Sequence, residues 1–189
     1  MRVIAGKYRS RRLRSLPGLK LRPTADRLRE TLFDVLSAGN PDSLQGTVWL
    51  DVFAGTGAVG IEALSRGAGM VYFVESSARY AELIRSNLQS LPLETGFKIL
   101  RKDSIHALRE LNRSAVRADF VFLDPPYDME RSYREVLSFL ATSELLKGES
   151  AVIAEHQKKF DPGEAFANLQ RYRNLVQGDA ALSFYRLSG

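Results

Sequence analysis

The chain has 189 residues, a formal net charge of +5 and no cysteine. This length buries enough surface for one core without covalent staples, and the absence of cysteine excludes disulfides, thiolate metal sites and thiol nucleophiles. Two histidines are too few for a zinc site, so no metal is expected. No apolar stretch approaches the ~20 residues of a membrane span, and the basic N-terminus lacks the apolar core of a signal peptide. We therefore expect a soluble cytoplasmic protein without a membrane partner.

The first 29 residues are strongly basic. They hold ten of the 27 lysines and arginines against one acid, Asp26, so this segment carries +9 and the rest of the chain −4. Such asymmetry is typical of an arm that grips a polyanion, and a solvated, partly disordered tail is the alternative. Apolar residues such as Val3 and Leu13 favour a short hairpin packed on the body. We expect residues 1–23 to form this arm and residues 24–189 a single domain.

Strand and helix patterns alternate after the arm. The expected strands are residues 48–53, 70–75, 97–100, 120–123 and 150–155, with a terminal hairpin of residues 168–176 and 180–187. The expected helices run from a Thr24 cap to Gly39, from the glycine-rich turn to Gly67, from 77 to 90, through 108 and 111, and from 131 to 140. Five alternations before a hairpin favour an open, mostly parallel sheet with helices on both faces.

A glycine-rich turn follows the first strand. Ala54-Gly55-Thr56-Gly57 leads into a helix, and glycines there let the backbone turn tightly and let a ligand approach the helix N-terminus. Gly55, Gly57 and Gly60 also match the dinucleotide-binding spacing, which alone is a weak signal. A dehydrogenase is therefore one alternative, although it leaves the later Asp-Pro-Pro-Tyr motif without a role.

Acidic residues lie at or just beyond four successive strand ends. They are Asp51, Glu75, Asp103 and Asp124. In open α/β sheets the carboxyl ends of the strands border the ligand crevice, and a carboxylate at the end of the second strand can accept both ribose hydroxyls. Capping of the following helix explains Asp103 equally well.

The most informative motif is Asp124-Pro125-Pro126-Tyr127, directly after the apolar run 120–123. The prolines fit neither a helix nor a continuing strand, so Asp124 is expected at the carboxyl end of a buried strand. A carboxylate and rigid carbonyls beside an aromatic ring suit a planar molecule that bears an amino group.

Together these motifs resemble S-adenosylmethionine-dependent amino methyltransferases. Three further stretches, 2–6, 22–30 and 62–68, make the chain similar to the bacterial 16S ribosomal RNA guanine-N2 methyltransferase family known as RsmD over nearly its whole length. Thr56 stands where many relatives have serine, which keeps the hydroxyl. The resemblance implies a Rossmann-like class I methyltransferase fold with a mostly parallel seven-stranded sheet. It also implies a monomer that acts on 16S rRNA within the small ribosomal subunit or its assembly intermediate.

The resemblance also implies roles for individual residues, with S-adenosyl-L-methionine as cofactor. The implied cofactor-binding residues are Asp51, Phe53, Ala54, Gly55, Thr56, Gly57, Glu75, Ser76, Asp103 and Ser104. The implied catalytic residues are Asp124, Pro125, Pro126 and Tyr127. The Asp124 carboxylate and Pro125 carbonyl would accept hydrogen bonds from the guanine amine, while Tyr127 stacks on the flipped base. The candidate phosphate contacts are Arg9, Arg11, Arg12, Arg14 and Arg22.

The choice of guanine depends on the resemblance, because Asp-Pro-Pro-Tyr serves several amino acceptors. Two alternatives therefore stay open: a DNA or RNA amino-methyltransferase that acts on adenine, and a non-catalytic RNA-binding assembly factor.

Overall fold

A computed structural model describes residues 1–16, 23–126 and 128–188. Its strands are Val48–Val52 (β1), Met70–Val74 (β2), Phe97–Leu100 (β3), Ala118–Leu123 (β4), Leu146–Gln157 (β5), Ala165–Phe166 (β6), Leu169–Gln177 (β7) and Ala180–Leu187 (β8). Its helices are Pro23–Leu36 (α1), Ala58–Ser65 (α2), Ala78–Gln89 (α3), Ser104–Arg113 (α4) and Glu130–Thr142 (α5). The expected alternation of strands and helices is therefore present.

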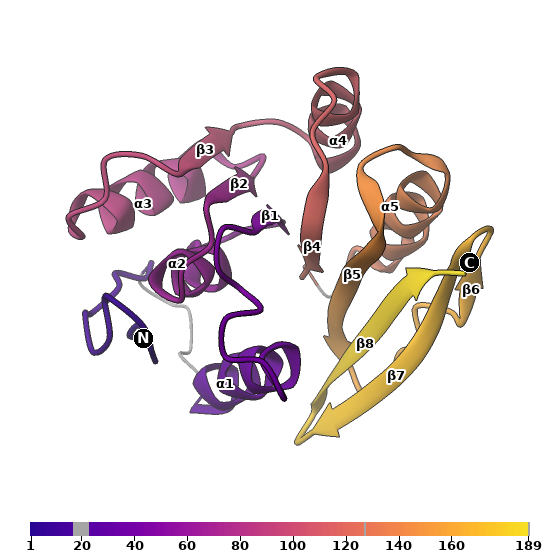
Figure 1. The fold of residues 1–189 in the computed structure, drawn as a ribbon, viewed down its shortest axis with the longest axis horizontal. Coiled ribbons are helices and arrows are strands. Elements are labelled where there is room, and N and C mark those ends of the chain that lie inside the picture. Colours follow the sequence, from indigo (N-terminus) through magenta and orange to yellow (C-terminus); the bar gives the residue numbers. More distant parts are fainter. Residues whose placement is uncertain (17–22, 127, 189) are drawn as a thin grey trace.

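The strands form one sheet in the order β3-β2-β1-β4-β5-β8-β7-β6 (Figure 1). Strands β1 to β5 pair in parallel, and β8, β7 and β6 pair antiparallel. The predicted fold class is confirmed, with the two-residue β6 as an eighth strand beyond the seven expected. The strand order reverses between β1 and β4, and the crevice outside their carboxyl ends is where such sheets bind ligands.

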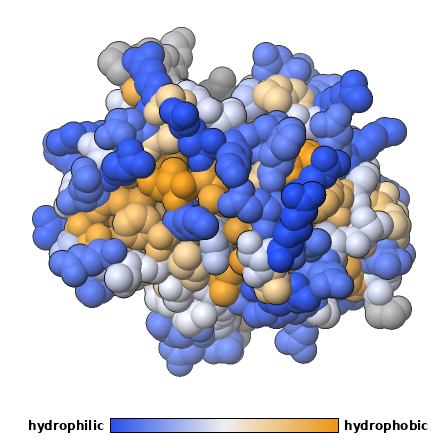
Figure 2. Space-filling view, turned by 90° about the horizontal axis from the view of Figure 1, so that it is seen from above, coloured by the Kyte–Doolittle hydropathy of each residue, from blue (hydrophilic) through white to orange (hydrophobic). Residues whose placement is uncertain are grey.

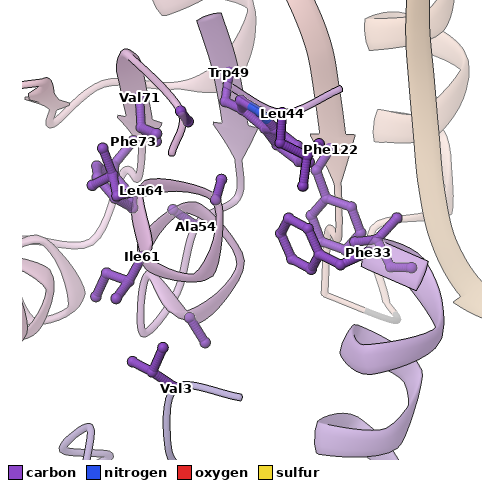
Figure 3. Close-up of a cluster of buried hydrophobic side chains, with 14 of the residues drawn as sticks. Val3, Phe33, Leu44, Trp49, Ala54, Ile61, Leu64, Val71, Phe73 and Phe122 are labelled. Carbon is purple, nitrogen blue, oxygen red and sulfur yellow. The ribbon is translucent and has the colours of Figure 1, made fainter. Parts of the chain in front are cut away.

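Two hydrophobic cores cover the two faces of the sheet. Helices α1, α2 and α3 lie on one side, and α4 and α5 on the other (Figure 1). Trp49 and Leu50 are adjacent in β1 but pack into different cores, because successive strand residues point to opposite faces. In Figure 3 Phe33 of α1 points toward Phe122 and Trp49, and its ring centroid is 5.3 Å from that of Trp49.

The N-terminal segment forms a short hairpin on the α2 side of the body. Arg2 and Arg12 form an antiparallel bridge, and the Val3 amide donates to the Arg11 carbonyl at 2.9 Å. The side chains of Val3, Tyr8 and Leu13 are buried in the α1–α3 core, so the segment is attached to the body.

The longest strand, β5, extends further than the apolar run predicts. The run indicates residues 150–155, whereas antiparallel pairing with β8 continues the strand to Gln157, which lies opposite Ala180. Glu155 is therefore inside β5, although the neighbouring strand β4 has already ended at Leu123.

No helix within the described parts of the chain is long and apolar enough to cross a membrane. In Figure 2 hydrophilic residues are spread over the face shown, with apolar residues exposed between them.

Candidate active site

The glycine-rich turn between β1 and α2 has an unusual backbone. Phe53, Gly55 and Gly57 have φ angles of 64°, 52° and 76°. A left-handed conformation is ordinary for glycine but costs about 1–3 kcal/mol for a residue such as phenylalanine. Two hydrogen bonds fix the turn, from the Ala54 amide to the Val74 carbonyl at 3.0 Å and from the Gly57 amide to the Ala54 carbonyl at 2.7 Å. Strained backbone of this kind is concentrated at functional sites.

Asp51 ties the start of α2 to β1. Its carboxylate accepts a hydrogen bond from the Gly60 amide at 2.9 Å and is almost fully buried. Gly60 also lets the start of α2 pack closely on β2, because a Cβ atom at that position would lie 2.3 Å from the Phe73 ring. Burial is the main reason that the pKa of Asp51 is raised to about 7; the hydrogen bond from Gly60 opposes this shift, and the nearby charges of Asp124 and Glu75 add to it.

Glu75 fixes the outer side of the same turn. One carboxylate oxygen accepts from the Gly55 amide at 2.9 Å and the other from the Ser77 amide at 2.8 Å. Each oxygen keeps a free lone pair, as recognition of two ribose hydroxyls requires. Among the described residues, apart from its chain neighbours, the nearest atom to a Cβ at Gly55 would be the Phe53 carbonyl oxygen at 3.9 Å, so this part of the structure leaves open space for a ligand. These features fit the expected nucleoside cofactor.

Asp103 caps the N-terminus of α4, which is the alternative role that the sequence allowed for it. Its carboxylate accepts from the amides of Ile105 at 3.0 Å and His106 at 3.4 Å. The side chain is exposed and borders a groove of about 750 Å³ along α4, while Ser104 beside it is buried and Ser76 is exposed. Among the described residues, the contacts of Asp103 use one carboxylate oxygen, Oδ1, so the cap does not exclude contact of the other oxygen with an adenine edge.

Asp124 lies one residue beyond β4. Its amide donates to the Val52 carbonyl at 3.3 Å, so the parallel pairing of β4 with β1 continues to this residue. Burial raises the pKa of its carboxyl group to about 7. Pro125 is buried and Pro126 exposed, and Tyr127 lies outside the described residues. The structure therefore brings Asp124 near Asp51 and the glycine-rich turn.

Glu155 is a second acid at this place, and the sequence reasoning did not assign it a role. Leu123 lies opposite Ala154, so the next residues, Asp124 and Glu155, are neighbours on the same face of the sheet. Burial raises the pKa of Glu155 well above its ordinary value, the charge of Asp124 raises it further, and the charge of Arg29 partly offsets both. The sequence signal that could have identified Glu155 is an acid at the end of an apolar strand, the same signal that marks Asp51, Glu75, Asp103 and Asp124.

Arg29 shows that the basic segment is not uniformly exposed. The side chain is buried, donates to the Arg2 carbonyl at 2.6 Å and pairs with Asp26 at 3.2 Å. Burial lowers the pKa of Arg29, while the charges of Glu62 and Asp26 oppose that shift. By contrast, Arg9, Arg11, Arg12 and Arg14 are exposed. The remaining candidate, Arg22, lies outside the described residues.

The family model described as Conserved hypothetical protein 95 matches residues 1–186. Ribosomal RNA small subunit methyltransferase D of Haemophilus influenzae is 35% identical over 159 residues, which cover 84% of this chain and 79% of that protein. The protein of the same name from Escherichia coli K12 is 31% identical over 186 residues, which cover 98% and 89% of the two chains. The chain belongs to this family.

Solved structures agree with this assignment. The Escherichia coli protein yhhF has a TM-score of 0.82 at 30% identity, and the match covers 100% of this chain and 98% of that one. SMU.776, solved in complex with SAH, has a TM-score of 0.66 over 85% of this chain and 48% of that one, and its 14% identity shows the fold alone. The predicted family and the methyltransferase fold are thus confirmed, whereas the choice of acceptor base is a separate question.

Proposed function

We propose that this chain transfers a methyl group from S-adenosyl-L-methionine to the exocyclic N2 of a guanine in 16S rRNA of the small ribosomal subunit. Its relatives are named as methyltransferases of small-subunit ribosomal RNA, and its fold is that of a protein solved with SAH. The observation that carries the proposal is the position of Asp124, at a strand end beside the turn that Glu75 fixes.

The cofactor would be held by the glycine-rich turn and by Glu75. The strained turn presents the open side of Gly55, and Glu75 offers two carboxylate oxygens that backbone amides already orient. Asp51 is buried beneath them and would act indirectly, by holding the start of α2 through the Gly60 amide. When bound, the cofactor supplies a methyl group made electrophilic by the adjacent sulfonium.

The remaining difficulty is the acceptor, because the lone pair of a guanine amine is delocalised into the ring. The Asp124 carboxylate and the Pro125 carbonyl would each accept a hydrogen bond from this amine. They would thereby orient its lone pair and stabilise the positive charge that grows on nitrogen. In this proposal Tyr127 stacks on the base after it has left its helix. Arg9, Arg11, Arg12, Arg14 and Arg22 would contact phosphates and hold the RNA in register.

The deciding experiment is transfer of labelled methyl from S-adenosylmethionine into small ribosomal subunits that lack the modification, followed by nucleoside analysis. Labelled N2-methylguanosine is the expected product. Label in adenine would keep the chemistry and reject the acceptor. Cofactor binding without any labelled product would instead favour a non-catalytic assembly factor.

A further inference from the structure

The terminal hairpin carries an exposed aromatic ring between two arginines. The Tyr172 side chain, at a bulge in β7, is 46% exposed, and the short strand β6 pairs with β7 before this position, at Leu169 and Gln170. The guanidinium carbon of Arg186 lies 5.3 Å from the Tyr172 ring centroid, and that of Arg173 lies 5.9 Å from the Phe184 ring. Tyr172 and Phe184 are themselves in contact, with 6.2 Å between ring centroids.

These side chains lie on the face of the sheet opposite α5. Phe184 packs into the core on the α1–α3 side, whereas the next residue, Tyr185, packs into the core that includes α5. Tyr172 and Arg173 contact the Phe184 ring, and Arg186 contacts the Tyr172 ring. All three side chains therefore lie on the same face as Phe184. In Figure 1 α5 and α1 lie on opposite sides of this part of the sheet.

The two arginines are not neutralised by carboxylates. Neither Arg173 nor Arg186 forms an ion pair with any described residue, whereas Arg171 on the other face pairs with Asp161 at 2.6 Å and with Glu164 at 3.2 Å. Burial raises the pKa of Tyr172, and the positive charges of Arg186 and Arg173 oppose that shift. The face therefore has a positive local charge, although the body of the chain is acidic overall.

The patch is on the same face as the proposed acceptor site. Arg173 lies opposite Phe184, which lies opposite Ile153, two residues before Glu155 along β5. Because strand residues alternate, Ile153 and Glu155 point to one face, which is also the face of Asp124. Two residues along the strands and three strand spacings, from β7 across β8 and β5 to β4, correspond to about 7 Å along and about 14 Å across the sheet. One RNA stem is wide enough to extend over both places.

We propose that Tyr172, Arg173 and Arg186 form a second RNA-contact surface, in which Tyr172 stacks on an unpaired base and the two arginines contact phosphates. An anionic partner that also carries flat rings complements this combination, and RNA has both features. The inference rests on the proposed function, because it assumes an RNA substrate. It adds a contact on the opposite side of the acceptor site from the N-terminal arm.

Binding of an RNA fragment that contains the acceptor guanine tests the surface, with affinity measured over a range of salt concentrations. Arg173→Gln combined with Arg186→Gln should weaken binding about tenfold and reduce the salt slope by one to two. Tyr172→Leu should weaken binding about tenfold with the slope unchanged, because leucine keeps the packing on Phe184 but not the stacking. Arg134→Gln, on the exposed side of α5, is the matched control and should change neither quantity.

A photoreactive phenylalanine derivative at position 172 identifies the partner in intact small subunits, with the same derivative at position 134 as control. Cross-links to RNA from position 172 alone would support the proposal. Cross-links to a ribosomal protein, or variants that bind RNA as tightly as the parent, would overturn it. If the second surface fails these tests but the parent protein transfers methyl and binds RNA, the proposed function stands. If the parent protein does neither, the proposed function and the second surface are both overturned.

Discussion

Asp124 and Glu155 are side by side on neighbouring parallel strands, and both have raised pKa values because they are buried. Two carboxyl groups in such a place do not both carry charge at neutral pH. The pKa of Asp124 is raised to about 7, whereas that of Glu155 is raised well above its ordinary value with Asp124 as a contributing charge. We therefore assign the retained proton to Glu155, whereas Asp124 becomes charged as the pH rises through about 7.

Replacement of Asp124 by alanine should separate chemistry from cofactor binding. In the proposed role the carboxylate acts on the acceptor amine, so Asp124→Ala should lower the rate of methyl transfer at least ~100-fold. The dissociation constant for S-adenosylmethionine, measured by calorimetry, should change much less. Asp128→Ala removes an exposed acid four residues later and serves as control. An equal loss of both properties would make Asp124 a cofactor or structural residue.

The pH dependence of transfer should report the same carboxylate. Charged Asp124 accepts the amine hydrogen bond more strongly than the protonated acid and stabilises the positive charge on nitrogen, so the rate at saturating cofactor should fall as the pH drops through about 7. Glu155→Gln should leave this midpoint in place, because glutamine resembles the protonated acid. A midpoint that moves to lower pH in this variant would show instead that Glu155 is charged. The measurement is a pH profile of single-turnover rates for both proteins.

At the scale of elements, helix α2 connects the N-terminal arm to the cofactor turn. Its Glu62 is fully buried and accepts hydrogen bonds from the amides of Ile4 at 2.7 Å and Ala5 at 2.9 Å. On α3, Asn87 accepts from the Arg14 amide at 2.7 Å and donates to the Thr56 carbonyl at 3.0 Å. The body thus holds the arm by its backbone, which leaves the arginine side chains of the arm available at the surface.

Gly6 is the position where this attachment is most sensitive to substitution. It has a φ of +77°, and a Cβ atom there would lie 1.9 Å from the Ser65 carbonyl oxygen. Gly6→Ala should therefore lower the free energy of unfolding by about 2–4 kcal/mol and weaken RNA binding, while cofactor affinity is kept. Gly39→Ala is the control, because Gly39 has a similar φ of +81° but no described residue beyond its chain neighbours would lie within 4 Å of a Cβ atom there. Calorimetric melting gives the comparison, and equal effects would show that backbone strain alone matters.

At the scale of the whole molecule, charge is divided between a basic arm and an acidic body. The structure modifies this division in two places. Arg29 is buried against Asp26 and the arm backbone, so it does not contribute an exposed charge, and Arg173 and Arg186 place positive charge at the far end of the body. Positive surface therefore lies on both sides of the proposed acceptor site.

The arm should dominate the salt dependence of RNA binding. Substitution of Arg9, Arg11 and Arg12 by glutamine should reduce the slope of log affinity against log salt by about two to three, since each phosphate contact contributes roughly 0.7 to 0.9. The control is the same substitution at Arg109, Arg113 and Arg134, which are exposed on α4 and α5. Similar slopes for the two triple variants would contradict a specific role for the arm.

Local sequence patterns predicted most of the helices and strands, because the start and end of each element depend largely on residues that are neighbours in the chain. The prolines after Leu123 end β4, the glycine-rich turn starts α2, and alternating apolar runs mark the strands, as observed. The strand predicted at residues 150–155 was too short at both ends, because its extension depends on pairing with distant segments, with β4 at Leu146 and with β8 up to Gln157, rather than on its own apolar run.

The sequence by itself determined the order of the elements, the acids at strand ends and the basic arm, because each depends on residue type and spacing along the chain. Only the tertiary structure decided which of these residues meet. The register of β4 against β5 makes Glu155 the neighbour of Asp124, and the packing of α1 buries Arg29. The bulge in β7 puts Tyr172 beside Arg186. Pairings between distant segments follow from the packing of the whole sheet, and no local pattern contains them.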